Sequence, residues 1–192
     1  MNQLHMIHTL ERIPDIPLAK GFSLRNYRPG DEPAWIEICK HGLLKPEDGM
    51  EAWNSAILSV PEIDPGKDVF FVCDEAGKPV ATVTVYVNAE GSGRVHMVAA
   101  RPEVKGNGIG AFMAAFALRR LEQRIPSAQC RMVGLNTDDW RVPAIVGYLR
   151  SGFQPVLYDV DMDKRWKAIC DQLNMHGIRM LDENGNPTDI VL

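Results

Sequence analysis

The sequence lacks any hydrophobic run long enough to cross a membrane, and its first residues lack the basic and apolar regions of a secretory signal peptide. It also lacks an excess of positive charge. Its 192 residues carry 21 Lys and Arg against 25 Asp and Glu, which gives a formal net charge of −4. That balance excludes the basic surface typical of nucleic-acid-binding domains. We therefore expect a cytoplasmic protein that binds neither membranes nor nucleic acid.

Cysteine is scarce and scattered. The four cysteines are Cys39, Cys73, Cys130 and Cys170, and no two are spaced like a metal knuckle or a redox motif. Free thiols and no bound metal are expected. Internal repeats and low-complexity segments are also missing, while 45% of the residues are apolar and 24% are charged. This is ordinary globular composition, and the length fits one domain with an additional arm.

Hydrophobic periodicity and turn residues predict the order of the elements. Strands are expected over residues 22–27, 69–73, 80–87, 93–100, 130–137 and 154–160. Helices are expected over residues 29–42, 45–58, 111–125, 138–153 and 163–175, the first with Asp31 as its N-cap and the fourth with Asp138 or Asp139. Residues 178–192 fit either a terminal hairpin around "NGNP" or a loose tail.

Hairpin signals come first along the chain, and alternation of strands and helices follows. This order predicts an α/β (α+β) fold with a mixed, mostly antiparallel central sheet and helices on both faces. We divide the chain into an N-terminal arm (1–20), a main domain (21–160), and a C-terminal helix and tail (161–192) packed on the same domain.

A glycine-rich loop, "RPEVKGNGIGAF" (101–112), stands between a predicted strand and a predicted helix. The spacing Gly106-x-Gly108-x-x-Ala111 formally matches a dinucleotide fingerprint, but "RPEVK" separates it from the strand and the expected ribose-binding acid is missing. A P-loop would need Lys and Ser or Thr after its last glycine. Backbone N–H groups at a helix N-terminus suit a pyrophosphate, and Lys105 can add a charge.

This loop and a later motif together resemble the GCN5-related N-acetyltransferase (GNAT) superfamily. The family loop is R/Q-x-x-G-x-G/A, with Lys105 here in place of Arg or Gln, and the later motif A-x-x-x-Y-x-x-x-G-F is matched by Ala144, Tyr148, Gly152 and Phe153. The resemblance covers Phe22 to about Asp159. It implies the acyl-CoA N-acyltransferase fold, in which acetyl-CoA lies between two splayed parallel strands, the fourth and fifth. Here these are residues 93–100 and 130–137.

The resemblance also implies which residues hold acetyl-CoA. At a bulge in the first of these strands, backbone groups of Val98, Ala99 and Ala100 would bind the pantetheine arm. The pyrophosphate would lie on Lys105, Gly106, Asn107, Gly108, Ile109, Gly110 and Ala111. Arg141 occupies a position where the family often has Asn, and it fits either a phosphate contact or a plain surface charge. Asn136 could supply an amide instead.

Two residues are candidates for catalysis. Tyr148 matches the family residue that protonates the departing thiolate, whereas a tyrosine merely packed on the sheet is the alternative. His96 lies where many members carry a glutamate base, and it fits equally a structural or substrate-contacting role. Strand alternation places Val95, Met97 and Ala99 on one face and Arg94, His96 and Val98 on the other. Asp138 and Asp139 are more simply helix caps.

The acceptor side would be built by the first two helices and their loop. Trp35, Trp53 and Met50 fit a pocket lining or the core, and we favour the core. The expected activity is acetyl-CoA-dependent transfer of an acetyl group to a primary amine of a small molecule or protein, by a monomer or homodimer. A non-catalytic acyl-CoA-binding sensor is the alternative. A nicotinamide-dependent oxidoreductase is disfavoured by the distance of the loop from its strand.

Overall fold

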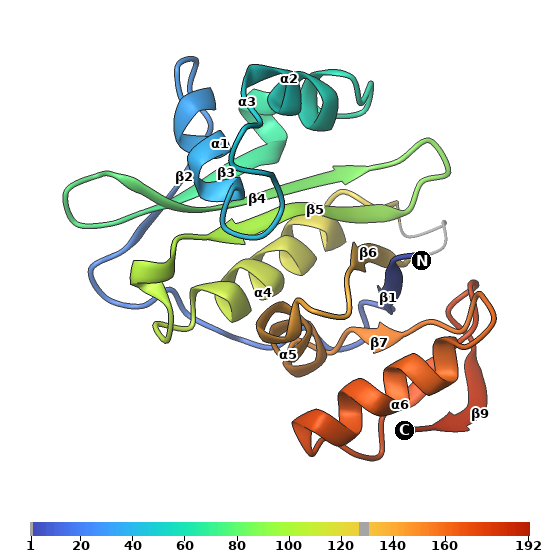
Figure 1. Cartoon of the computed structure of the whole chain (residues 1–192). Helices are drawn as coiled ribbons and strands as arrows, with labels where there is room; N and C mark the ends of the chain where they lie inside the picture. The colour runs from blue at the N-terminus through green and yellow to red at the C-terminus, as the bar shows by residue number, and fades with distance from the viewer. Residues whose placement is uncertain (1, 127–130) are drawn as a thin grey trace.

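The structure is a computed structural model, shown in Figure 1, that describes residues 2–126 and 131–192. The strands are β1 (Leu4–His8), β2 (Ser23–Asn26), β3 (Val69–Cys73), β4 (Pro79–Val87), β5 (Gly93–Ala100), β6 (Val133–Thr137), β7 (Gln154–Pro155), β8 (Arg179–Leu181) and β9 (Pro187–Val191). The α-helices are α1 (Glu32–Cys39), α2 (Met50–Trp53), α3 (Pro65–Asp68), α4 (Ile109–Glu122), α5 (Val142–Arg150) and α6 (Met162–Leu173). A π-helical turn (Asn54–Leu58) continues α2, and a 3-10 turn (Pro102–Val104) precedes α4.

A seven-stranded sheet forms the centre of the molecule. Its strand order is β2-β3-β4-β5-β6-β1-β7, and neighbouring strands are antiparallel except for β5 and β6, which are parallel. Helices α1 to α3 cover one face, and α4 and α5 cover the other (Figure 1). The predicted fold class, including one parallel pair within a mostly antiparallel sheet, is confirmed.

Strand β1 was not predicted, although it lies inside the sheet between β6 and β7. It pairs antiparallel with β6 from Leu4 opposite Thr137 to His8 opposite Val133. Four of its five residues are buried, so the stretch lacks the apolar–polar alternation that marks a half-exposed strand. The expected N-terminal arm therefore contributes to the sheet. The division at residues 20/21 and 160/161 stays a prediction.

Several helix boundaries differ from those predicted. Residues 45–48 form a turn, closed by a hydrogen bond from the Lys45 N–H to the Asp48 carboxylate (2.7 Å), so α2 begins only at Met50. The fourth predicted helix, α5, begins at Val142 with Arg141 as its N-cap. Neither Asp138 nor Asp139 caps it, because both carboxylates are bound elsewhere, as described below. Cys130, the first residue predicted for the strand that is β6, lies outside the described residues.

The short face helices enclose a small aromatic core. Trp35 and Trp53 are fully buried and meet edge to face, with ring centroids 5.2 Å apart. Tyr27 stacks on Trp53 at 5.1 Å. The preference for these tryptophans as core residues is confirmed. The same preference for a core position is wrong for Met50, because its side chain, at the first position of α2, is 47% exposed.

The C-terminal segment contributes to the main hydrophobic core through α6. Trp166 of α6 is fully buried within the main hydrophobic core. After α6, strands β8 and β9 pair antiparallel, which confirms the hairpin rather than the loose tail. Leu181 of β8 forms a parallel bridge with Val156, just after β7. The hairpin is thereby joined to the edge of the main sheet.

One ion pair joins the end of α4 to the opposite layer of helices. Arg124 donates from Nη1 to Oδ1 of the buried Asp68 at 2.6 Å, and to the Val85 carbonyl at 3.2 Å. Arg124→Ala leaves a buried carboxylate without a counter-ion, so it should lower the free energy of unfolding by about 3 kcal/mol. Chemical denaturation measures this. Lys78→Ala, which breaks an exposed 3.8 Å pair with Glu103, should cost less than about 0.5 kcal/mol. Equal losses would contradict the prediction.

His5 of β1 makes the fold sensitive to acid. Burial, and then the nearby Arg94 charge, lower the pKa of His5 from 6.5 to about 4. Between about pH 6.5 and 4, His5 binds a proton in the unfolded chain but not in the folded chain. The free energy of unfolding therefore falls as the pH falls through this range. With allowance for solvent screening, His5→Gln should remove about 2 kcal/mol of this loss. Denaturation at pH 7 and pH 4.5 tests it, with the exposed His176→Gln as control. An unchanged pH slope in His5→Gln would refute it.

Candidate active site

Strands β5 and β6 form a gap because they pair only at their beginnings. Gly93 pairs with Val133 and Arg94 with Gly134, after which no further pairing joins the two strands in the described part of the chain. A cavity of about 330 Å³ lies beside this gap. Its lining includes His96, Val98, Asn136, Arg141 and Tyr148. Five residues predicted from separate parts of the sequence therefore face one space.

A bulge in β5 sits beside the cavity, where the sequence analysis expected one. Thr82 pairs with Ala99 and Thr84 with His96, so Met97 and Val98 together lie opposite a single residue of β4. Met97 has a φ of +50°, in the left-handed region that non-glycine residues rarely adopt. A bulge leaves the extra residue outside the regular ladder, so backbone groups there are available to a ligand.

The bulge also corrects the predicted alternation of β5. Val95 packs in the main core with α4, whereas Met97 and Ala99 pack against the aromatic core of α1 and α2. Val98 and Ala100 lie against the main core. The prediction that Val95 shares a face with Met97 and Ala99 is wrong, because one extra residue shifts every later side chain to the other face.

The glycine-rich loop leads from β5 into α4. Gly106 and Gly108 have φ values of +90° and +72°, and Gly108 is the N-cap residue of α4. A Cβ built at Gly106, Gly108 or Gly110 would meet no heavy atom within 4 Å among the described residues. The first N–H groups of a helix have no partner within it, and the helix dipole is positive at that end. The loop therefore presents an open, electropositive cradle that fits a pyrophosphate.

Tyr148 lies on α5 with its side chain buried. Its ring meets Phe153 edge to face, with centroids 5.8 Å apart. Burial raises the pKa of Tyr148, and the nearby Arg141 charge opposes that rise. The phenol is therefore protonated at neutral pH and can act as a hydrogen-bond donor or an acid toward the cavity that it lines.

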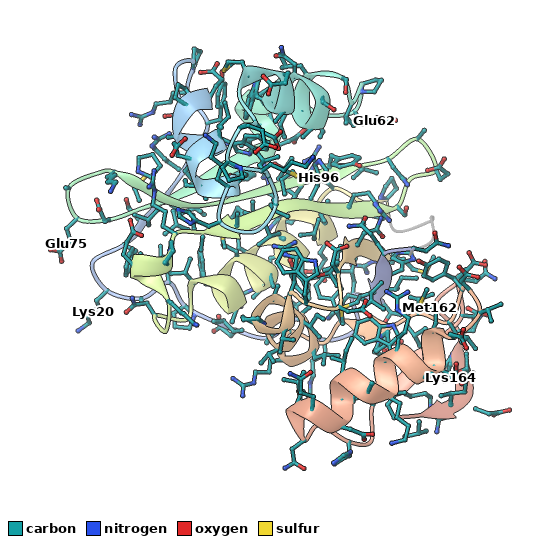
Figure 2. All side chains as sticks on the ribbon, in the orientation of Figure 1. Lys20, Glu62, Glu75, His96, Met162 and Lys164 are labelled. Carbon is teal, nitrogen blue, oxygen red and sulfur yellow. The ribbon has the colours of Figure 1, made fainter. Side chains whose placement is uncertain are left out.

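His96 lies on β5, beneath the layer of short helices (Figure 2). Its Nε2 is 3.0 Å from the carbonyl oxygen of Ala56, so the ring donates from Nε2 and keeps Nδ1 free to accept a proton. Burial lowers the pKa of His96, an effect that the Ala56 hydrogen bond opposes and that Arg94 reinforces. The imidazole is neutral at pH 7. This geometry gives His96 a structural contact and leaves one nitrogen for chemistry.

Arg141 bridges the gap from the start of α5. Its Nη2 donates to the carbonyl oxygen of Val98, in the bulge, at 3.0 Å. The two neighbouring aspartates are held by other partners. Asp138 accepts from Gln3 of the N-terminal segment at 3.2 Å, and Asp139 forms a bidentate ion pair with Arg165 of α6. These contacts explain why neither aspartate caps α5.

Other cavity residues were not identified from the sequence. Arg94 and Tyr86 come from β5 and β4, and Trp140 precedes α5. A Cβ at Gly42, in the loop after α1, would lie 3.7 Å from the Trp140 ring, which is itself 66% exposed. The two loops therefore meet at the mouth of the cavity. No local pattern in the sequence marks this meeting.

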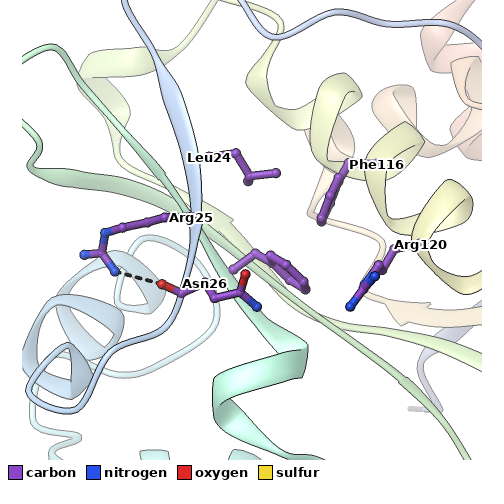
Figure 3. Close-up of a pocket in the computed structure, with 6 residues that line it drawn as sticks. Leu24, Arg25, Asn26, Phe116 and Arg120 are labelled. Atoms are coloured by element: carbon purple, nitrogen blue, oxygen red, sulfur yellow. Dashed lines mark hydrogen bonds between the residues drawn. The ribbon is translucent and has the colours of Figure 1, made fainter.

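A second hollow of about 300 Å³ lies between β2, β3 and α4 (Figure 3). Its lining is Leu24, Arg25, Asn26, Phe70, Phe116 and Arg120. The predicted acid, the predicted base and the loop glycines do not contribute to it. Across residues 2–126 and 131–192, no helix is long and apolar enough to span a membrane, and no three His, Cys, Asp or Glu side chains are grouped as metal ligands.

A splayed parallel pair, a bulge beside it and a glycine cradle at a helix N-terminus are the features expected of the acyl-CoA N-acyltransferase fold. A family comparison agrees: the Acetyltransferase (GNAT) family matches residues 33–153, and the chain belongs to this family. The match contains β5, the loop and the Tyr148 motif.

The similarity to individual relatives covers only about half of each relative's own length. A mycothiol acetyltransferase of Streptomyces bingchenggensis is 33% identical over 156 residues, covering 78% of this chain and 48% of that protein. One from Mycobacterium sp. (strain MCS) is 27% identical over 175 residues, covering 88% of this chain and 56% of that protein. The chain thus spans about half the length of these relatives.

Solved structures show the same fold. A GCN5-related N-acetyltransferase from Sphaerobacter thermophilus superposes with a TM-score of 0.63 at 23% identity, covering 81% of this chain and 49% of that chain. The ribosomal-protein-S18-alanine N-acetyltransferase from Escherichia coli superposes with a TM-score of 0.53 at 17% identity, covering 68% and 76%. At these identities the likeness concerns the fold alone.

Proposed function

We propose that this chain is an acetyl-CoA-dependent N-acetyltransferase that transfers an acetyl group to a primary amine by direct attack. The observation that carries the proposal is the arrangement of three parts along one gap. The glycine cradle follows the end of β5, the bulge lies within β5, and Tyr148 lines the cavity beside the bulge. Membership of the Acetyltransferase (GNAT) family supports acetyl-CoA as the co-substrate.

The cradle would hold the pyrophosphate of acetyl-CoA, and the bulge would hold its pantetheine arm. The N–H groups around Gly108 and the start of α4 suit the pyrophosphate, and the exposed Lys105 can approach it. Backbone groups of Val98, Ala99 and Ala100 suit the amides of pantetheine. Arg141 would then have to release the Val98 carbonyl, so that this carbonyl can accept a hydrogen bond from the co-substrate instead. Asn136 faces the same cavity.

The chemistry needs positioning, one proton acceptor and one proton donor. The lone pair of the neutral amine attacks the thioester carbonyl carbon, a C–N bond forms, and the C–S bond breaks with its electrons on sulfur. His96 Nδ1 would accept the proton that the amine nitrogen loses. Tyr148 would donate its phenolic proton to the departing thiolate, which is free coenzyme A after protonation. Holding both partners in one cavity supplies much of the rate through orientation.

The names of the relatives bear on the acceptor. Several are mycothiol acetyltransferases, which supports a small-molecule amine as the acceptor of this chain. The chain spans only about half of those proteins, so their substrate is not carried over by name.

A thiol-release screen tests the proposal. The full chain is mixed with acetyl-CoA and a panel of amines, free coenzyme A is measured with a thiol reagent, and acetylated amine is identified by mass spectrometry. We expect equal amounts of thiol and acetylated amine, and a much lower rate in Tyr148→Phe. Acetyl-CoA binding by calorimetry with no thiol release from any amine would instead favour a non-catalytic acyl-CoA-binding module.

A further inference from the structure

Arg94 stands at the closed end of the gap. It forms the last pair that joins β5 to β6, and it lines the cavity with a half-buried side chain. The glycine cradle follows the opposite end of β5, and the six residue steps from Arg94 to Ala100 span about 20 Å. A co-substrate held by the cradle reaches along β5 toward Arg94. Arg94 therefore belongs to the part of the cavity that the acceptor would occupy.

The positive charge of Arg94 has no counter-ion among the residues that the structure describes. Within residues 2–126 and 131–192, no carboxylate lies within 4.0 Å of its guanidinium, and the group donates no hydrogen bond. Arg25, Arg124 and Arg165 each have such a carboxylate. A guanidinium without a protein partner keeps its N–H groups available to a ligand in the cavity, and a bidentate anion is the ligand that matches its geometry.

A glycine in β6 makes room for this guanidinium. A Cβ on Gly134 would lie 2.7 Å from Nη1 of Arg94 and 3.0 Å from Nε2 of His5. The guanidinium therefore lies directly over the β6 backbone, between β5 and β1. His5 is neutral at pH 7, because its pKa is lowered to about 4. Arg94 is thus the positive charge at this end of the cavity, whereas the other arginine of the lining, Arg141, lies at the bulge and donates to the Val98 carbonyl.

The same cavity also contains a carboxylate, that of Asp138, whose Oδ1 accepts from Gln3. No Lys or Arg nitrogen of the described chain lies within 4.0 Å of it, so the two charges stay separate. An amine that arrives as an ammonium ion is attracted to Asp138, and an anion on the same molecule is attracted to Arg94. We infer that the acceptor amine also carries a carboxylate or phosphate group, and that Arg94 binds this anion. The inference rests on the proposed function.

Pairs of amines that differ in an anionic group test whether the acceptor site recognises an anion. 4-Aminobutanoate is compared with butylamine, and 2-aminoethyl phosphate with ethanolamine, because each pair shares an amine and differs in the anionic group. Binding to the complex of the protein with coenzyme A is followed by ligand-observed NMR, and turnover by thiol release. We expect at least one anionic member to bind and react at least tenfold better than its neutral partner. The two pairs also separate carboxylate from phosphate recognition.

Variants then assign that preference to Arg94. Arg94→Gln removes the charge and should abolish the preference by lowering binding and kcat/KM of the anionic member much more than those of its neutral partner. Arg94→Lys should restore part of it. Arg150→Gln removes an exposed charge at the last residue of α5, outside the cavity lining, and should leave the preference intact. Acetyl-CoA affinity, measured by calorimetry, should be unchanged in all three, which separates a binding role from misfolding.

The outcomes for the anion site and for the enzyme can be told apart. Charge-dependent binding that Arg94→Gln abolishes, but without thiol release, supports the anion site and overturns the proposed function. Thiol release with no preference for the anionic amines, unchanged in Arg94→Gln, supports the proposed function and overturns the anion site. Absence of binding by every anionic amine also overturns the anion site.

Discussion

Replacing Gly108 by glutamate is expected to abolish measurable binding of acetyl-CoA. The new carboxylate would stand at the N-cap of α4, in the open space that suits the pyrophosphate. Two unit charges about 4 Å apart in a partly buried setting repel by about 4 kcal/mol, which corresponds to about a thousandfold loss of affinity. Isothermal titration calorimetry with acetyl-CoA measures the loss.

Two control variants separate charge from backbone strain. Gly77, in the turn between β3 and β4, has a φ of +78° and the same open surroundings, so Gly77→Glu imposes equal strain at a distance from the cradle. It should leave affinity unchanged. Gly108→Asn keeps a residue that tolerates the left-handed region and adds no charge, so affinity should fall by less than about tenfold. Wild-type affinity in Gly108→Glu would rule out the cradle as the pyrophosphate site.

Replacing Tyr148 by phenylalanine should lower kcat by about a hundredfold or more, the range typical of a lost general acid. The KM for acetyl-CoA should change by less than about twofold, because the hydroxyl acts on the departing sulfur rather than on the bound ground state. Phenylalanine keeps the buried ring and its contact with Phe153, so the free energy of unfolding should change little. Steady-state kinetics with an amine from the thiol-release screen measure both constants.

Tyr27→Phe is the matched control for this loss. It also removes a tyrosine hydroxyl, one that donates to Glu32 on the side of the aromatic core. Its kcat should stay near the wild-type value. A Tyr148→Phe protein that turns over at the wild-type rate would show that solvent, not Tyr148, protonates the thiolate.

Features encoded by residue type at fixed spacing were predictable from the sequence. Gly106 and Gly108 adopt the positive φ values that only glycine adopts without strain. These two glycines were therefore enough to locate the loop in the sequence. The helix predicted around Tyr148 is present as α5, and in the structure Tyr148 lines the cavity. Whether Tyr148, His96 and the loop residues perform their assigned roles stays a prediction.

Features that depend on long-range pairing were not predictable. Strand β1 carries no alternation of its own, and its place is fixed by its pairing with β6. The bulge at Met97 reflects a mismatch in residue number between β4 and β5. The residues "VHMVAA" alone do not reveal it, and it was expected only because the resemblance to the GNAT superfamily implied a bulge in this strand. Arg94 could not be assigned to the acceptor side, because its surroundings come from β1, β6 and the loop before α5.

The position of β1 has a consequence for the order in which the molecule folds. The first strand of the chain completes the sheet beside β6, a pairing of very high contact order, and such pairings form late because the intervening loop must close first. During synthesis β1 emerges before any of its partners and must wait for them. Strands β3 to β5 can assemble as consecutive hairpins in the meantime, and β2 can join β3 across the segment that contains α1 to α3. The wall of the gap that bears the cradle is thus built early, and the wall formed by β6 is fixed only when β1 docks beside it.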